Sequence, residues 1–126
     1  MAEYLDTDWS NPASYSQAVR HGDMIFTSGN LGADPGGAAV DFATQATVAL
    51  ERMIASVEGL GGSLDTILRI GAYIADINDF AEWDEVYRRV ISRSPMPART
   101  TVQIGGFAAP NTVEVDCVAY VPAEGS

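Results

Sequence analysis

The reactive side chains of this sequence restrict the chemistry that it can perform. All seven basic residues are arginine, and the chain has one histidine, His21, and one cysteine, Cys117. Without a lysine it cannot form a Schiff base with a carbonyl substrate or with pyridoxal phosphate. One cysteine and one histidine also cannot supply a disulfide or the Cys/His sites that zinc favours. We therefore expect no cofactor and no metal.

Covalent catalysis and phosphate binding are disfavoured as well. A nucleophilic triad would need His21 beside a serine or threonine, but His21 falls at a predicted hairpin turn, where an exposed imidazole is ordinary. Cys117 falls on the apolar face of a predicted strand, which favours a packed core thiol over a nucleophile. The glycine-rich segments 29–37 and 59–62 lack a P-loop lysine and a G-x-G-x-x-G pattern, so we interpret them as caps and turns.

Arg99 and Glu114 are the pair that could bind and hydrolyse a small acid. Arg99 begins a predicted strand after the proline-containing run 95–98, and its planar guanidinium suits a carboxylate. On the last predicted strand, alternation places Glu114 and Asp116 on the face turned away from the helices, and alternation on the preceding strand favours Arg99 on that same face. Each residue alone is more often a solvated surface side chain. Together they could hold a carboxylate and poise a water molecule.

The elements that must position these residues follow from hydrophobic periodicity. Alternating residues predict strands, and apolar residues at helical spacing predict helices. In chain order the pattern predicts a hairpin of strands 16–20 and 24–28, a helix from the N-cap Asp41 to the glycines at 59–62, a strand 67–74, a helix 79–92, and strands 99–104 and 112–121. Residues 29–40 are interpreted as a glycine-rich loop.

This β-β-α-β-α-β-β order predicts the α+β class. It divides into two β-α-β halves with extra strands, which supports one mixed sheet of roughly four to six strands carrying two helices on one face. The other face of the sheet then needs a partner or water. With 126 residues the chain has the size of one ordinary domain, and we expect a single domain over residues 1–126.

Charge and hydropathy restrict the partners and the location. The chain carries 17 acidic and 7 basic residues, a formal net charge of -10. An acidic surface repels phosphate groups, so neither nucleic acid nor an anionic membrane is an expected partner. No run approaches the roughly 20 apolar residues of a membrane span, and the acidic N-terminus lacks the apolar core of a signal peptide. We expect a cytoplasmic protein.

Four stretches of the sequence carry a resemblance to a known family, and together they extend over nearly the whole chain. They are YSQAV at 15–19 with FTSGN at 26–30, GGSLD at 61–65, ADINDF at 75–80, and PARTTV at 97–102 reaching VEV at 113–115. The last stretch is the most specific. These stretches resemble the RidA/YjgF family of reactive-intermediate deaminases.

The resemblance implies a chorismate-mutase-like α+β sheet, a homotrimer with active sites between subunits, and an activity. Family members hydrolyse reactive 2-imino or enamine acids, such as 2-iminobutanoate or 2-iminopropanoate, to 2-oxo acids and ammonia. By position, Arg99 would bind the substrate carboxylate and Glu114 would orient or activate water. The other implied substrate-binding residues are Tyr15, Ser28, Gly29, Asn30 and Thr101. No metal or covalent nucleophile is needed, because an imine carbon is already electrophilic.

Several positions depart from the family pattern. Ala13-Ser14 stands where Gly-Pro is frequent, Asn30 where glutamine is frequent, and Thr101 where cysteine is frequent, and the loop 32–40 differs as well. These differences bear on pocket shape and substrate range. The alternative to an enzyme is a trimer that binds or senses a carboxylate metabolite without turning it over. A ribonuclease, which the acidic composition disfavours, and a purely structural trimer are weaker alternatives.

Overall fold

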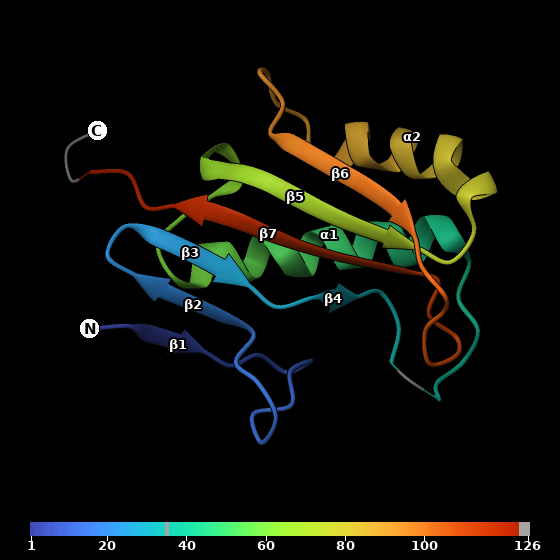
Figure 1. Ribbon diagram of the computed structural model, residues 1–126, viewed down its shortest axis with the longest axis horizontal. Coiled ribbons are helices and arrows are strands. Elements are labelled where there is room, and N and C mark those ends of the chain that lie inside the picture. Colours follow the sequence, from blue (N-terminus) through green and yellow to red (C-terminus); the bar gives the residue numbers. More distant parts are fainter. Residues whose placement is uncertain (35, 124–126) are drawn as a thin grey trace.

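Within residues 1–34 and 36–123, which the computed structural model describes, seven strands form one mixed sheet (Figure 1). The strands are β1 Glu3–Leu5, β2 Ala18–His21, β3 Met24–Thr27, β4 Asn30–Leu31, β5 Ile67–Ile74, β6 Ala98–Gln103 and β7 Val113–Tyr120. They are ordered β1-β2-β3-β7-β5-β6, and β4 also pairs with β7. β5 and β6 are parallel, whereas the other neighbours are antiparallel. The predicted α+β class with a mixed sheet is confirmed.

In the described chain two α-helices pack on one face of this sheet. They are α1 Phe42–Gly59 and α2 Phe80–Val90, and short 3-10 turns, Leu64–Thr66 and Ile77–Asp79, precede β5 and α2. In Figure 1 α1 runs behind the central strands, and α2 lies toward the β6 edge. Both helices share one buried cluster, in which Leu50 and Met53 of α1 and Trp83 of α2 join Ile70 of β5 and Val115 of β7. This confirms the predicted helical layer.

The ends of α1 follow from its sequence. The helix begins after Asp41, as predicted, although the Asp41 side chain makes no capping hydrogen bond. It ends at Gly59, and Gly61 then adopts a φ of +99°, a left-handed conformation that favours glycine. The glycines at 59–62 therefore do stop this helix.

Alternation along β7 sorts its side chains between the helix face and an open face. Its helix-facing residues are buried, and they are Val113, Val115, Cys117 and Ala119. Glu114 and Asp116 point to the open face and are only partly buried. The predicted division of this strand is confirmed.

β5 follows the predicted alternation except at its start. Ile70, Ala72 and Ile74 are buried against the helices, as expected. Alternation predicts Leu68 on the same face, but Leu68 is 46% exposed. The reason is a register irregularity between Ile67 and Arg69, which shifts the strand by one position there.

The N-terminal half contains the predicted hairpin and two unpredicted strands, β1 and β4. β2 and β3 form the hairpin, and Gly22 turns the chain with a φ of +60°. The predicted loop 29–40 includes β4, which pairs with β7 beyond the end of β3. A strand of two residues is too short for alternation to reveal. Pro35, in the same loop, lies outside the described residues.

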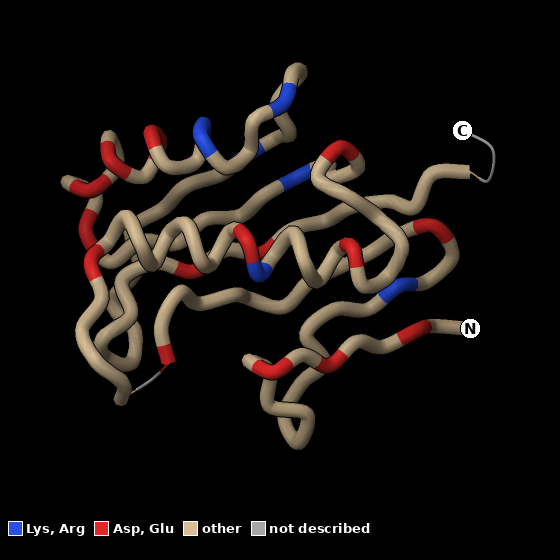
Figure 2. Tube along the Cα trace, turned by 180° about the vertical axis from the view of Figure 1, so that it is seen from behind, with Lys and Arg blue, Asp and Glu red and all other residues tan. Residues whose placement is uncertain are grey.

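Acidic residues are distributed over the helices and the connecting loops, with arginines between them (Figure 2). Among the described residues, none of the helices has the length and hydropathy needed to cross a membrane.

Candidate active site

Four of the predicted site residues line one pocket of about 250 Å³ on the open face of the sheet. We call it the Glu114 pocket. Its lining residues are Tyr15, Ser28, Gly29, Leu31 and Glu114. They come from β7, from β4, from the chain between β3 and β4, and from the segment before β2. The fold therefore collects residues that are almost 100 positions apart along the sequence.

Gly29 allows the Glu114 carboxylate to lie directly against the backbone. A Cβ atom at Gly29 would overlap Oε1 and Cδ of Glu114. Gly29 is not among the glycines with positive φ, so the requirement here is close approach and not an unusual backbone conformation. Glycine at this position therefore leaves room for the carboxylate.

Two buried amide side chains hold the wall of the Glu114 pocket from behind. Gln17 Nε2 donates to the Gly29 carbonyl at 3.2 Å and to Asn30 Oδ1 at 2.9 Å. Asn30 Nδ2 donates to the Ser28 carbonyl at 3.2 Å, and Trp9 Nε1 donates to Asn30 Oδ1 at 2.9 Å. Gln17 and Asn30 are both completely buried. These bonds fix the backbone of Ser28 and Gly29.

The position of Asn30 corrects its implied role as a residue that touches substrate. Asn30 is paired with Val115 of β7, whose side chain faces the core, so the Asn30 side chain also points inward. It therefore lies behind the pocket and not in it. Its effect on a ligand would pass through Ser28 and Gly29.

The surroundings of Glu114 favour the neutral form of its carboxyl group, compared with a carboxyl group in water. Burial in the pocket, and then the negative charge of Asp116 two residues along the same face, raise the pKa of the Glu114 carboxyl above its ordinary value. Asp116 is itself held by Tyr73, whose hydroxyl donates to Asp116 Oδ2 at 3.1 Å. Tyr73 lies across from Glu114 in the β5–β7 register. A carboxylate whose pKa is raised is a stronger base than an ordinary one, which suits a role in proton transfer.

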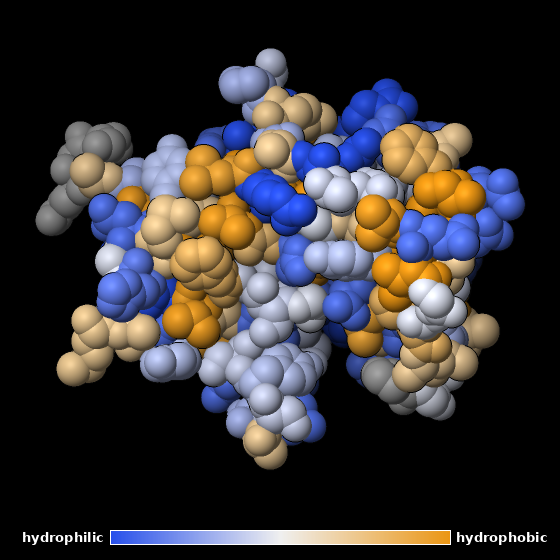
Figure 3. All heavy atoms as spheres, in the orientation of Figure 1, coloured by the Kyte–Doolittle hydropathy of each residue, from blue (hydrophilic) through white to orange (hydrophobic). Residues whose placement is uncertain are grey.

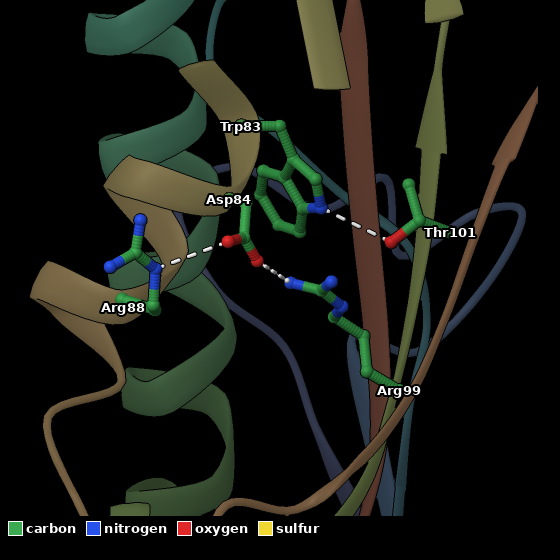
Figure 4. Close-up of polar contacts among 5 residues, drawn as sticks. All are labelled: Trp83, Asp84, Arg88, Arg99 and Thr101. Atoms are coloured by element: carbon green, nitrogen blue, oxygen red, sulfur yellow. Dashed lines mark hydrogen bonds and ion pairs between the residues drawn. The ribbon is translucent and has the colours of Figure 1, made fainter. Parts of the chain in front are cut away.

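Arg99 lies in a second pocket of about 350 Å³ against α2. We call it the Arg99 pocket. Its lining residues are Asp84, Tyr87, Arg88, Met96, Pro97 and Arg99. Arg99 Nη1 donates to Asp84 Oδ1 at 2.8 Å, as Figure 4 shows. The guanidinium carbon lies 4.6 Å from the ring centroid of Tyr87 and 5.6 Å from that of Phe80. Arg99 thus has both ionic and cation–π contacts with one helix.

The prediction that Arg99 shares the face of Glu114 is wrong. Arg99 pairs with Ile70, which is buried on the helix face, whereas Thr100 pairs with Gly71 and so shares the open face with Asp116. The error arises because β6 is an edge strand with polar residues on both sides. Its apolar Val102 suggests the core, yet Val102 is 41% exposed on the open face.

Thr101 shares the helix face with Arg99. Its Oγ1 accepts a hydrogen bond from Nε1 of the fully buried Trp83 at 3.1 Å (Figure 4). The Thr101 side chain therefore anchors α2 to β6. Thr101 is absent from the residues that line the Arg99 pocket.

Neither His21 nor Cys117 joins either pocket. His21 ends β2 and is exposed. Cys117 is 3% exposed, and burial raises the pKa of its thiol to about 12. The prediction of a packed core thiol is confirmed.

Asp84 was not identified as a site residue by sequence reasoning. Its spacing of four residues from Arg88 predicts an ordinary ion pair on a helix surface, and Arg88 Nε does donate to Asp84 Oδ2 at 3.1 Å. The sequence signal that could have identified Asp84 is its position next to Trp83 and three residues before Tyr87. That position borders the buried stripe of α2 and faces the neighbouring strand.

Comparison with known proteins agrees with this architecture. A family model described as Endoribonuclease L-PSP matches residues 8–121. The Escherichia coli protein named "Putative reactive intermediate deaminase TdcF" is 33% identical over 109 residues, which cover 83% of this chain and 84% of that protein.

Solved structures show the same fold. RidA from an Antarctic Psychrobacter superposes with a TM-score of 0.84 at 32% identity, over 94% of this chain and 99% of that one. Escherichia coli TdcF with bound serine also gives a TM-score of 0.84, at 30% identity over 95% and 99% of the two chains. The fold, the matched length and these relatives agree with one another, and the chain belongs to the RidA/YjgF family of reactive-intermediate deaminases.

Proposed function

We propose that the protein hydrolyses 2-imino and enamine acids, such as 2-iminobutanoate and 2-iminopropanoate, to 2-oxo acids and ammonia. The observation that carries the proposal is the division of the site residues between two pockets. The Glu114 pocket contains a carboxyl group suited to proton transfer, and the Arg99 pocket contains a guanidinium suited to a carboxylate. The two pockets lie on opposite faces of one sheet, so a complete site takes Arg99 from one copy and Glu114 from another.

Glu114 acts on the water molecule in this proposal. The carboxylate accepts a proton as the water oxygen forms a C–O bond to the imine carbon. The nitrogen gains one proton from solvent as the C=N bond becomes single, and a second from Glu114, which returns to the carboxylate. The C–N bond then breaks and ammonia leaves, while the hydroxyl proton passes to solvent as the C=O bond of the 2-oxo acid forms. The raised pKa of Glu114 supports this role, because a carboxylate with a raised pKa is a stronger base than an ordinary one.

Arg99 binds the substrate carboxylate in this proposal. Its guanidinium is ordered by α2 and is 21% exposed at the side chain, so it can still reach a ligand. A planar guanidinium binds a carboxylate with two parallel hydrogen bonds, which orients the imine carbon as well as holding it. The serine bound to TdcF is a small amino acid with such a carboxylate.

The open face of the sheet supports assembly of several copies, which we propose to be a homotrimer. Exposed apolar side chains on this sheet include Tyr4 at 70%, Phe26 at 50% and Leu68 at 46%. Tyr4, Val19, Phe26 and Val118 follow one row across four strands. Figure 3 views the molecule from the side opposite α1 and shows hydrophobic regions on this face. Contiguous apolar surface of this kind is typical of an interface.

The direct test generates 2-iminopropanoate or 2-iminobutanoate in situ and follows ammonia release or loss of imine absorbance. The purified protein should accelerate hydrolysis above the rate in buffer. Glu114→Gln should lose on the order of a hundredfold or more of that acceleration, since it removes the acid–base group. Arg99→Ala should raise KM strongly.

Two exposed positions provide matched controls. Glu51→Gln and Arg89→Ala make the same chemical changes on helix surfaces outside the Glu114 and Arg99 pockets, and both should keep the parent rate. Ammonia release no faster than in buffer from the folded protein would reject the enzyme. Saturable binding of 2-oxo acids without turnover would then favour the metabolite-binding alternative.

A further inference from the structure

We infer that Asp84 is the positioning residue for Arg99: it orients the guanidinium for the substrate carboxylate and does not compete with that carboxylate. The inference rests on the proposed function, because it assigns Arg99 a carboxylate ligand. It concerns a helix side chain that is separate from the groups proposed to touch substrate.

The contacts of the guanidinium leave one of its edges available. Asp84 Oδ1 accepts from Nη1 at 2.8 Å, and the Tyr87 ring lies against the guanidinium at 4.6 Å. Within the described part of the chain, Nη2 and Nε of Arg99 make no hydrogen bond. An arginine carries five N–H donors in a rigid fork, so one acceptor at Nη1 leaves room for a second carboxylate. Figure 4 shows Asp84 approaching from α2.

Asp84 is itself held in place, which is what a positioning residue requires. Its second oxygen, Oδ2, accepts from Arg88 Nε at 3.1 Å, one helical turn away. Both oxygens are therefore engaged. The hydrogen bond from Arg99 lowers the pKa of Asp84, so the group is charged throughout the neutral range.

The charge balance of this cluster also favours an incoming anion. Asp84 carries one negative charge between two guanidiniums, those of Arg88 and Arg99, so the trio has a net charge of +1. A free arginine side chain would have to be ordered when the ligand binds, at a cost in conformational entropy. Because α2 has already ordered Arg99, that cost is reduced for the substrate.

A positioning residue and a competitor predict opposite results. If Asp84 orients Arg99, removing its oxygen weakens carboxylate binding. If Asp84 competes for Arg99, removing its charge strengthens binding. Three variants of the full chain separate these outcomes: Asp84→Ala, Asp84→Asn, which keeps an acceptor oxygen without the charge, and Glu85→Gln, which removes a neighbouring exposed charge from the same helix.

The experiment titrates 2-oxobutanoate, the product expected from 2-iminobutanoate, by calorimetry, and measures KM and kcat separately with the imine. Asp84→Ala should weaken 2-oxobutanoate binding and raise KM by about tenfold, with kcat within about twofold of the parent, because orientation of a charged hydrogen bond is lost. Asp84→Asn should restore most of the affinity. Glu85→Gln should match the parent. Circular dichroism and thermal unfolding verify that each variant is folded.

The outcomes separate failure of the inference from failure of the proposed function. If the parent binds 2-oxobutanoate and Asp84→Ala binds it equally or more tightly, the positioning role is wrong. Tighter binding by both Asp84 variants would identify a competitor instead. If the parent binds no 2-oxo acid and turns over no imine, the proposed function falls, and the inference falls with it.

Discussion

Arg99 and Glu114 lie on opposite faces of the same sheet, on the two strands that flank β5. Arg99 is paired with Ile70 on the helix face, and Glu114 is paired with Tyr73 on the open face. The sheet backbone separates the two side chains, so a small imino acid cannot contact both within one chain. A site that uses both residues must be shared between copies, and this can be tested directly.

Two impaired variants should recover activity when they assemble together. In a trimer that takes Arg99 from one subunit and Glu114 from the next, random mixing of Arg99→Ala and Glu114→Gln subunits leaves about a quarter of the sites intact. Coexpression followed by the ammonia-release assay measures the recovery. Each variant purified alone is the control. Mixed trimers that show no recovery would mean that no active site combines Arg99 of one copy with Glu114 of another.

Gly29→Ala should slow turnover strongly while leaving the protein folded. The new Cβ would displace the Glu114 carboxylate, which can move because it is the end of a flexible side chain. We expect a loss of rate on the order of a hundredfold, as for removal of a general base. Gly105→Ala is the matched control, because a Cβ there meets nothing within 4 Å. Parent-like kcat in folded Gly29→Ala would show that the carboxylate position is unimportant.

Asp116→Asn should move the acid limb of the pH–rate profile to lower pH. The negative charge of Asp116 contributes to the raised pKa of Glu114, so its removal lowers that pKa. Glu114 must be deprotonated to accept a proton from water, so the variant keeps activity further into acid. The other groups facing this site are Tyr73 and Arg69 of β5 and Tyr15 of the pocket wall.

Tyr73→Phe provides the control for this shift. It removes the hydroxyl that donates to Asp116 but leaves the Asp116 charge in place. The acid limb should therefore not move to lower pH in this variant. An unchanged or upward-shifted limb in Asp116→Asn would contradict the assigned electrostatic role.

Thr101→Val should reduce stability without changing KM. The substitution removes the acceptor of the buried Trp83 indole N–H and leaves that donor unsatisfied, at a cost of about 1–3 kcal/mol. Chemical denaturation measures the free energy of unfolding. Thr44→Val changes an exposed threonine of α1 and should stay within about 0.5 kcal/mol of the parent. A raised KM with parent-like stability would return Thr101 to the substrate-binding residues.

The fold was predictable from the sequence wherever a segment was long enough to show its period. The apolar spacing from Phe42 to Val57 and the clean alternation from Val113 to Ala119 both gave elements at the right positions. β1 and β4 have three and two residues, which is less than a period can reveal. Leu68 was misplaced because the strand irregularity beside it depends on pairing with β7.

The candidate site was predictable in part, for a related reason. Glu114 could be placed because its strand is central, and its neighbours are apolar on one side only. Arg99 could not be placed, because the edge strand β6 is polar on both sides. The side chains that bind its residues, Asp84 for Arg99 and the Trp83 indole for Thr101, belong to a helix. Those partners are contacts between elements, and local periodicity does not report them.

The glycine beneath the Glu114 carboxylate has a consequence for surveys of related sequences. A glutamate aligned with Glu114 is by itself a weak marker of activity, since strand residues are often acidic for solubility alone. The contact with Gly29 makes the two positions together a better marker of activity, because a larger residue at position 29 would overlap the Glu114 carboxylate. We therefore expect relatives with glutamate at 114 and a side chain at 29 to hydrolyse imines poorly, whatever the rest of their sequence.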